Sequence, residues 1–185
     1  PCDVLVVSGR IGDDGEVDGQ VVNALKWRYG LTIDPKNMLL RRNHEVWVVH
    51  QEMNHPHAPF NHVLCLFLPA DPVRAQALYG EGLLSVFSAL AALEYMGVGC
   101  KKIGMSFLAG HRVQGLDTAV EQLVLSSLHW LKKSSQSLEV CCTLLQIDEV
   151  DDFDSEMNRS LGRSTVGVDG DPMIAALRAE VLTLT

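Results

Sequence analysis

Short apolar runs recur along the chain, and each one ends at a turn or a polar loop. The runs are rich in β-branched and other large apolar residues, which is typical of strands buried on both faces of a sheet. Residues 53–61 contain two prolines and are interpreted as a loop between two of these runs. The predicted strands are residues 4–7, one or two strands within 37–51, and then residues 62–68, 102–107 and 138–147.

Helical spacing of apolar residues appears between these runs. Gly30 stands where a C-cap glycine belongs at the end of the first helical segment. Asp71 and Pro72 are typical of an N-cap and a first helical residue at the start of the second segment. The predicted helices are residues 17–29, then 72–96 with a break at 80–82, and an amphipathic helix at 117–133.

The alternation of strands and helices predicts an α/β fold, a three-layer α/β/α sandwich with a mixed, largely parallel sheet between the helical layers. We expect this domain over residues 1–147. Residues 148–154 are strongly acidic and are interpreted as a solvated linker. A final helix is predicted at residues 172–184, so residues 148–185 would be an acidic linker and a helix packed on the same domain.

Two glycine-bearing segments, residues 9–19 and 104–116, follow predicted strands. Ligands of such sheets sit at the carboxyl ends of the strands. The first segment holds four glycines and leads into a helix, whose start offers free N–H groups and a partial positive charge. It is therefore interpreted as a phosphate cradle, although neither the G-x-G-x-x-G nor the Walker pattern occurs. The alternative is a polar loop in which Asp13, Asp14 and Asp18 cap the helix.

The second segment carries two side chains suited to an anionic ligand. Arg112 supplies a permanent positive charge, and His111 can shuttle a proton near neutral pH. Gly110 and Gly115 flank these residues and lie between a predicted strand and a predicted helix. The alternative is that His111 and Arg112 are exposed polar residues in an ordinary turn.

Histidines cluster at His50, His55, His57 and His62. A metal site needs converging ligands that are themselves held by partners, and no spacing here matches a zinc pattern. We therefore expect no metal and no cofactor, with His50 and His62 flanking strands.

Five cysteines stand at irregular spacing, and an odd number of this kind is not a disulfide framework. Buried free thiols are expected, in a reducing, cytoplasmic compartment. A thiol–imidazole pair of Cys100 and His111, as in a cysteine-dependent hydrolase, is a less favoured alternative.

Composition and net charge limit the classes of partner that this chain is expected to bind. The chain has 185 residues, of which 47% are hydrophobic and 21% charged, and these values suit one globular domain. A formal net charge of -8 argues against a duplex nucleic acid, which needs a basic face, but not against a small anion held by backbone N–H groups. No apolar run is long enough to span a bilayer, so no membrane partner is expected. Because the chain opens directly into a strand, we expect a fragment of a longer protein.

Val17-Asp18-Gly19 and the segment leading to Gly110 and Gly115 carry a family resemblance. Together with the order of elements over about residues 3–147, they resemble the macrodomain family. Macrodomains are α/β/α modules that bind ADP-ribose, and some of them hydrolyse ADP-ribosyl linkages. Val17-Asp18-Gly19 is similar to the family's Val-Asp-Gly segment, which begins a helix beside the distal ribose. Residues 107–116 are similar to its second, phosphate-embracing loop.

The resemblance implies a macrodomain-like protein that binds, or binds and hydrolyses, ADP-ribose or a related NAD-derived nucleotide. Asp18 matches a position used by some hydrolytic members, and it is the candidate catalytic residue. The implied ligand-binding residues are Ser8, Gly9, Gly12, Gly15, Val17, Gly19, Ser106, Gly110, His111, Arg112 and Gly115. The alternative is a degenerate interaction or sensor module of a larger protein, without nucleotide binding.

Overall fold

The structure, a computed structural model, describes residues 1–12, 15–106, 108, 116–137, 139–144 and 182–183. Eight strands and four helices form within these residues. The strands are β1 (Val4–Ile11), β2 (Val17–Asp18), β3 (Met38–Arg41), β4 (Trp47–Glu52), β5 (His62–Phe67), β6 (Lys102–Ser106), β7 (Glu139–Leu144) and β8 (Leu182–Thr183). The helices are α1 (Gln20–Tyr29), α2 (Pro72–Ala77), α3 (Tyr79–Tyr95) and α4 (Leu116–Lys133).

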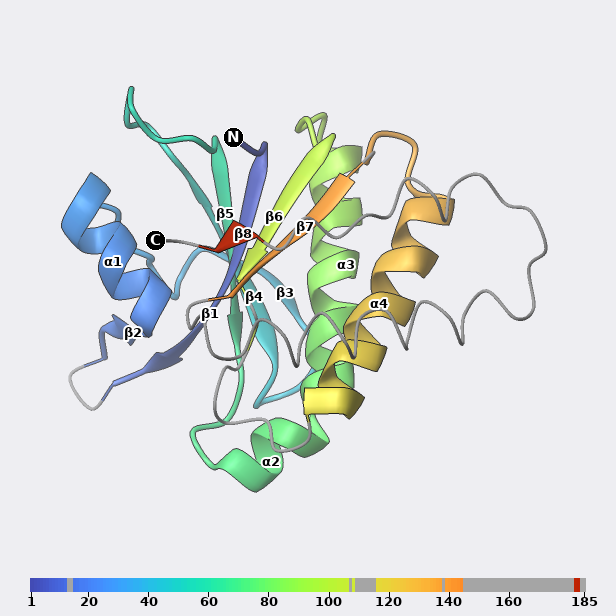
Figure 1. Cartoon of the computed structure of the whole chain (residues 1–185). Coiled ribbons are helices and arrows are strands. Elements are labelled where there is room, and N and C mark those ends of the chain that lie inside the picture. The colour runs from blue at the N-terminus through green and yellow to red at the C-terminus, as the bar shows by residue number, and fades with distance from the viewer. Residues whose placement is uncertain (13–14, 107, 109–115, 138, 145–181, 184–185) are drawn as a thin grey trace.

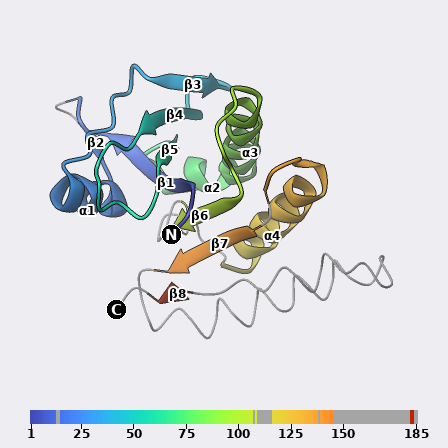
Figure 2. The same ribbon diagram turned by 90° about the horizontal axis from the view of Figure 1, so that it is seen from above.

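One sheet runs through the molecule in the strand order β3-β4-β5-β1-β6-β7-β8, and β2 pairs with β1 beside this path. The pairs β1–β5, β1–β6, β6–β7 and β7–β8 are parallel, whereas β1–β2, β3–β4 and β4–β5 are antiparallel. Helix α1 covers one face of the sheet, and α3 and α4 cover the other (Figure 1, Figure 2). The predicted three-layer α/β/α sandwich with a mixed, largely parallel sheet is confirmed.

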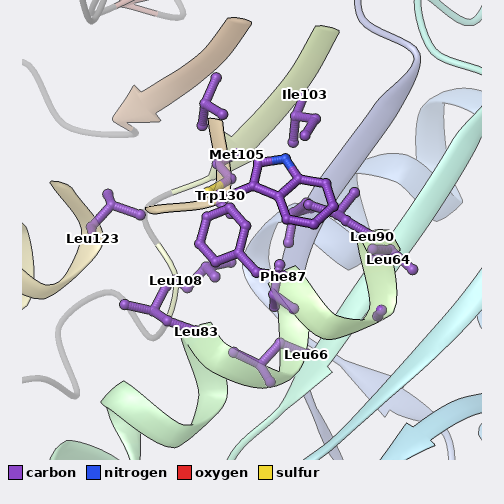
Figure 3. Packing of buried hydrophobic residues seen from close by; sticks show 14 of the residues in the cluster. Leu64, Leu66, Leu83, Phe87, Leu90, Ile103, Met105, Leu108, Leu123 and Trp130 are labelled. Carbon is purple, nitrogen blue, oxygen red and sulfur yellow. The ribbon is translucent and has the colours of Figure 1, made fainter. Parts of the chain in front are cut away.

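Two hydrophobic cores lie on the two faces of this sheet. The larger core packs the sheet against α3 and α4 and contains Phe87 and Trp130, whose rings lie close together (Figure 3). The smaller core packs the sheet against α1 and contains Val22. Successive side chains of a strand point to opposite faces, so Val6 of β1 enters the larger core and Val7 the smaller one. Burial on both faces explains why β1 begins as a continuous apolar run.

The predicted helix caps are confirmed at both positions that the sequence marks. Gly30 adopts a left-handed conformation with φ 66°, and its N–H donates to the carbonyl oxygen of Lys26 at 2.9 Å. The Asp71 side chain accepts a hydrogen bond from the backbone N–H of Arg74 at 2.8 Å, with Pro72 at the first helical position. These local contacts satisfy backbone groups that a helix end leaves unpaired.

The break in the second helical segment falls at Leu78, so the predicted break at residues 80–82 is wrong in position. Both glycines of that stretch lie inside α3. A Cβ atom on Gly82 would lie 3.1 Å from Leu66 Cδ2 and 3.2 Å from Leu68 Cδ2. The missing side chain lets α3 approach β5 closely, so this glycine allows packing and does not end the helix.

Two other segments differ from the prediction. β1 extends to Ile11 and pairs with residues 17–18, so the first helix begins at Gln20 and not at residue 17. Leu182–Thr183 form β8 beside β7, although the sequence predicts a helix there. Pairing with a neighbouring strand supplies backbone partners that local helical propensity cannot anticipate. The rest of that predicted helix, and the acidic segment 148–154, lie outside the described residues.

Four cysteines have described side chains, and all four are free thiols: Cys2, Cys65, Cys100 and Cys141. Cys65, inside an apolar run, and Cys100 are buried as expected, whereas Cys2 and Cys141 are half-buried. None of the helices in the described part of the chain is long and apolar enough to cross a membrane.

Candidate functional site

The carboxyl ends of β1, β5 and β6 meet at one end of the sheet, which we call the carboxyl edge. β1 is central to it, with Val7 opposite Cys65 of β5 and Val6 opposite Met105 of β6. This edge lies on the side of β2 and α2 in Figure 1. Sheets of this type bind ligands at this edge, which makes it the candidate site.

The first glycine-bearing segment forms a tight β-hairpin at the carboxyl edge. Arg10 pairs with Asp18 and Ile11 with Val17 across β1 and β2. The Gly12 N–H donates to the carbonyl oxygen of Glu16 at 2.8 Å, and the Gly15 N–H donates to that of Gly12 at 3.0 Å. Two of the glycine N–H groups in the predicted phosphate cradle therefore bond within the hairpin.

Gly9 and Gly19 let the end of β1 touch the start of α1. A Cβ atom on Gly19 would lie only 2.8 Å from the carbonyl oxygen of Ser8. A Cβ atom on Gly9 would lie 3.0 Å from Cys65 Sγ and from Val17 Cγ1. Glycine at position 19 therefore places the N-terminus of α1 directly against Ser8 and Gly9 of β1, and glycine at position 9 leaves room for Cys65 of β5 and Val17 of β2.

Asp18 is held by two side chains. Arg10 donates from Nε to Asp18 Oδ2 at 2.7 Å, and its Nη2 lies 2.6 Å from the same oxygen. Asn23 Nδ2, in the first turn of α1, donates to Oδ1 at 2.8 Å. Hydrogen bonds from Asn23 and Arg10 lower the pKa of the Asp18 carboxyl below its ordinary value. The carboxylate therefore stays ionised and is a fixed hydrogen-bond acceptor and a weak base.

Among the described residues, no side chain caps the N-terminus of α1. Gly19 is its N-cap residue, and no acidic residue stands in its first turn. The Asp18 carboxylate accepts from Arg10, from Asn23 and from the Gly19 backbone N–H, which precedes the first turn. Asp13 and Asp14, the other predicted caps, lie outside the described residues. First-turn N–H groups without a side-chain acceptor carry a partial positive charge that suits an anion.

Solved structures similar to this chain are macrodomains from Oceanobacillus iheyensis. A variant of that protein has a TM-score of 0.54 at 10% identity, covering 88% of this chain and 87% of that chain. A variant with ADPR has a TM-score of 0.53 at 11% identity, covering 87% of each chain. The macrodomain with ADP has a TM-score of 0.52 at 12% identity, covering 88% of this chain and 86% of that chain.

This chain has the macrodomain fold. The likeness spans nearly the whole of each chain, and it confirms the fold that the sequence resemblance implies. The sequence itself matches no protein-family model and no curated protein.

Of the two predicted loops, the structure describes the first, which lies at the carboxyl edge. The predicted residues in the hairpin and its junction with α1 are Gly9, Gly12, Gly15, Val17, Asp18 and Gly19. Ser8 lies half-buried in β1, opposite Leu66 of β5. Ser106 is buried, and its Oγ donates to the carbonyl oxygen of Val6 at 3.4 Å. Gly110, His111, Arg112 and Gly115 lie outside the described residues.

Sequence reasoning missed Arg10 and Asn23. Asp14-Gly15 between two extended runs is typical of a hairpin, and this signal could have brought Arg10 near Asp18, although it does not specify the observed register in which the two residues are paired. Asn23 lies on the first turn after Gly19, within reach of a carboxylate that immediately precedes the helix. Both residues become evident only when residues 17–18 are taken as a strand.

The histidine cluster separates into two pairs. His50 Nε2 and His62 Nδ1 lie 3.2 Å apart on neighbouring strands. His55 Nδ1 accepts a hydrogen bond from the backbone N–H of His57 in the loop between those strands. Burial and the neighbouring His62 lower the pKa of His50, against a smaller opposite influence of Glu52. The described residues hold no group of three or more His, Cys, Asp and Glu side chains arranged for a metal.

The Cys100 thiol lies in the larger core, away from solvent. Burial and the nearby carboxylates of Glu94 and Asp3 raise its pKa to about 11. A nucleophilic cysteine acts as the thiolate and is partly exposed, so this environment disfavours a cysteine-dependent reaction at Cys100. Its suggested partner His111 lies outside the described residues.

Proposed function

We propose that this chain binds ADP-ribose or a related NAD-derived nucleotide at the carboxyl edge. The observation that carries the proposal is the junction of β1 with α1, where Gly9 and Gly19 bring an uncapped helix N-terminus to the end of a central parallel strand. Macrodomain structures with ADPR and with ADP support it, because they share the fold. A helix N-terminus of this kind is a natural site for a diphosphate.

Each part of the junction has a role in this proposal. The N–H groups of the first turn of α1 hold the diphosphate. Asp18, kept ionised by Arg10 and Asn23, accepts a hydrogen bond from a ribose hydroxyl. Arg10 adds positive charge beside the phosphates. The residues of the second loop, Gly110–Gly115, remain predicted ligand-binding residues and lie outside the described residues.

We propose binding without hydrolysis as the main activity. A general base needs a pKa near the working pH, and the pKa of Asp18 is lowered below its already acidic ordinary value. Hydrogen bonds from Arg10 and Asn23 fix the orientation of the carboxylate, and its remaining lone pairs can still accept from a ribose hydroxyl. Asp18 therefore acts as a positioning group in this proposal.

A second candidate function is a module for protein interaction without nucleotide affinity. Two observations favour it: the N–H groups of Gly12 and Gly15 are engaged within the hairpin, and Arg10 neutralises Asp18. Under this alternative the hairpin is a closed surface feature that recognises a protein partner. For either function we propose a reducing, cytoplasmic compartment, which suits the free thiols.

Calorimetric titration of the full chain with ADP-ribose, ADP and NAD separates the two functions. The proposal expects saturable one-to-one binding of at least one ligand. It also expects that Gly19→Ala weakens binding by more than about tenfold, because the added methyl group pushes α1 away from Ser8. Gly99→Ala is the matched control, since a Cβ atom there meets nothing within 4 Å. No heat of binding at millimolar ligand would exclude nucleotide binding and favour the interaction module.

A further inference from the structure

The histidine pair His50–His62 lies at the other end of β5 from the carboxyl edge. His62 is the first residue of β5, and Phe67, at its last position, belongs to the carboxyl edge. The His50 and His62 rings are half-buried, with their centroids 5.3 Å apart and their planes inclined by 33°. Nothing in the proposed nucleotide site uses these side chains.

Strand pairing holds the two rings on one face of the sheet. In the antiparallel β4–β5 ladder, Glu52 stands opposite His62 and His50 stands opposite Leu64. Alternate residues of a strand share a face, so His50 and Glu52 project on the same side. His62 is then the direct neighbour of Glu52 and the diagonal neighbour of His50 across the strands. The backbone ladder therefore brings the imidazoles together independently of loop conformation.

The separation of the two ring nitrogens matches the bite of a metal chelate. Zinc–imidazole bonds of about 2.0–2.1 Å at a tetrahedral angle place two ligand nitrogens about 3.4 Å apart. His50 Nε2 and His62 Nδ1 are 3.2 Å apart. Without metal, one ring donates its N–H to the other. On metal binding that shared proton leaves to solvent, and both nitrogens direct their lone pairs at the ion.

The surroundings suit a cation with partly open coordination. A hollow of about 460 Å³ adjoins the His50 side of the pair and is lined by His50, Glu52 and Asn54, among others, but not by His62. The negative charge of the Glu52 carboxylate stabilises a positive charge at His50. Water in the hollow can fill the coordination positions that two imidazoles leave vacant.

We propose that His50 and His62 chelate one divalent transition-metal ion of the zinc class, with water in the remaining positions and Glu52 as the nearby balancing charge. Two imidazoles form a site selective for Zn²⁺, Ni²⁺ and Co²⁺ over Mg²⁺ and Ca²⁺, because nitrogen ligands favour the former group. With two protein ligands the ion exchanges readily, and its outer positions are accessible to small ligands.

The chain supplies its own matched control for this site. His55 and His57 form a second pair, with ring centroids 5.8 Å apart, in the loop between β4 and β5. Because these two residues lie in a loop, no strand ladder brings their ring nitrogens together. His55 Nδ1 instead accepts a hydrogen bond from the backbone N–H of His57. The double variant His55→Ala/His57→Ala therefore removes as many imidazoles without touching the proposed chelate.

The test is titration of the full chain with ZnCl₂ and CoCl₂, followed by calorimetry and by Co²⁺ absorption. Saturable one-to-one binding is expected, weakened by more than about tenfold in His50→Gln and in His62→Gln and retained in the His55/His57 double variant. MgCl₂ should give no binding. Equal affinity in all variants, loss only in the double variant, or an intense sulfur-to-cobalt charge-transfer band would overturn the proposal.

A second measurement needs no variant and covers the case in which one fails to fold. In the ¹⁵N-labelled full chain, Zn²⁺ should shift the ring-nitrogen resonances of His50 and His62 and leave those of His55 and His57 in place. Shifts confined to other histidines, or no shifts at saturating Zn²⁺, would exclude the site. Nucleotide titrations are independent of this result, since the site lies at the opposite end of β5.

Discussion

The two ends of the central sheet are built by different means. At the carboxyl edge the backbone makes the site, through a tight hairpin, two glycines and the N-terminus of α1. At the amino end side chains make the contacts. There the Asp3 carboxylate accepts from the Lys102 backbone N–H at 2.9 Å, and His50 meets His62 at 3.2 Å.

Because of this difference, the two ends of the sheet should tolerate different kinds of substitution. A site made by close backbone approach is damaged by any added carbon atom but is less sensitive to side-chain chemistry. A site made by side-chain pairs tolerates changes of volume better than changes of protonation or of hydrogen-bonding groups. The following substitutions and pH changes test that contrast, from the largest expected effect to the smallest.

Gly19→Val should have the largest effect. Its Cβ atom would lie 2.8 Å from the Ser8 carbonyl oxygen and 3.4 Å from Gly9 Cα, so β1 and α1 must separate. We expect a loss of about 1–3 kcal/mol in the free energy of unfolding, as for overpacked sites. Urea denaturation measures it, with Gly99→Val as control. A change within about 0.5 kcal/mol of that control would contradict a backbone-built carboxyl edge.

Gly15→Ala tests the effect of backbone conformation alone, without any steric contact of the added methyl group. The space around Gly15 is open, with nothing within 4 Å of an added Cβ atom, but its φ is 79°. An alanine in this left-handed conformation costs about 1–2 kcal/mol, which denaturation should detect. If Gly15→Ala is as stable as the parent chain, the hairpin turn does not need the conformation described above.

Asp18→Asn tests the contribution of side-chain charge at the carboxyl edge. The side chains of Arg10 and Asp18 are 48% and 39% exposed, so the expected loss of stability at neutral pH is below about 1 kcal/mol. Because the pKa of Asp18 is lowered in the folded chain, its contribution is complete above the unfolded value of about 3.9 and is lost as the pH falls through the folded value.

Denaturation curves of the parent and the Asp18→Asn variant should therefore converge in acid. Asp34→Asn, at an exposed turn, is the control for the loss of one carboxylate elsewhere on the surface. Divergence of the parent and Asp18→Asn curves as the pH falls would show that the sign of this linkage is reversed.

His50 gives the amino end a pH dependence of its own. Burial and His62 lower its pKa, so the unfolded chain binds more protons in the interval just below the ordinary histidine value of about 6.5. Stability should therefore decline as the pH falls through this interval, in the absence of added metal. His50→Gln should flatten the decline, whereas His57→Gln should not. Thermal unfolding between pH 7.5 and 5.5 measures both.

Local signals in the sequence predicted local structure well. Gly30 and Asp71 marked helix ends because their contacts reach only a few residues along the chain. The apolar runs predicted the buried strands for a similar reason, since burial on both faces imposes an unbroken apolar pattern. The family resemblance of Val17-Asp18-Gly19 then pointed to the macrodomain fold, which the structural likeness confirms.

The errors arose where a distant partner decides the local conformation. Residues 17–18 are a strand because β1 extends far enough to pair with them. The stretch around Gly82 stays helical because β5 lies directly beneath it. The contacts of His50 with His62 depend on the β4–β5 register, which no local pattern specifies. Site predictions in the second loop lie outside the described residues and remain predictions.

The position of β1 between β5 and β6 has a consequence for how the chain acquires its fold. Both parallel partners of β1 come later in the sequence, and its register joins Val4 to His62 on one side and to Ile103 on the other. Such long-range parallel pairing slows folding, because a long chain segment must be ordered before these contacts form. During synthesis this apolar strand therefore lacks its β5 partner until residue 67 has left the ribosome and its β6 partner until residue 106 has left, and it is prone to aggregation in that interval.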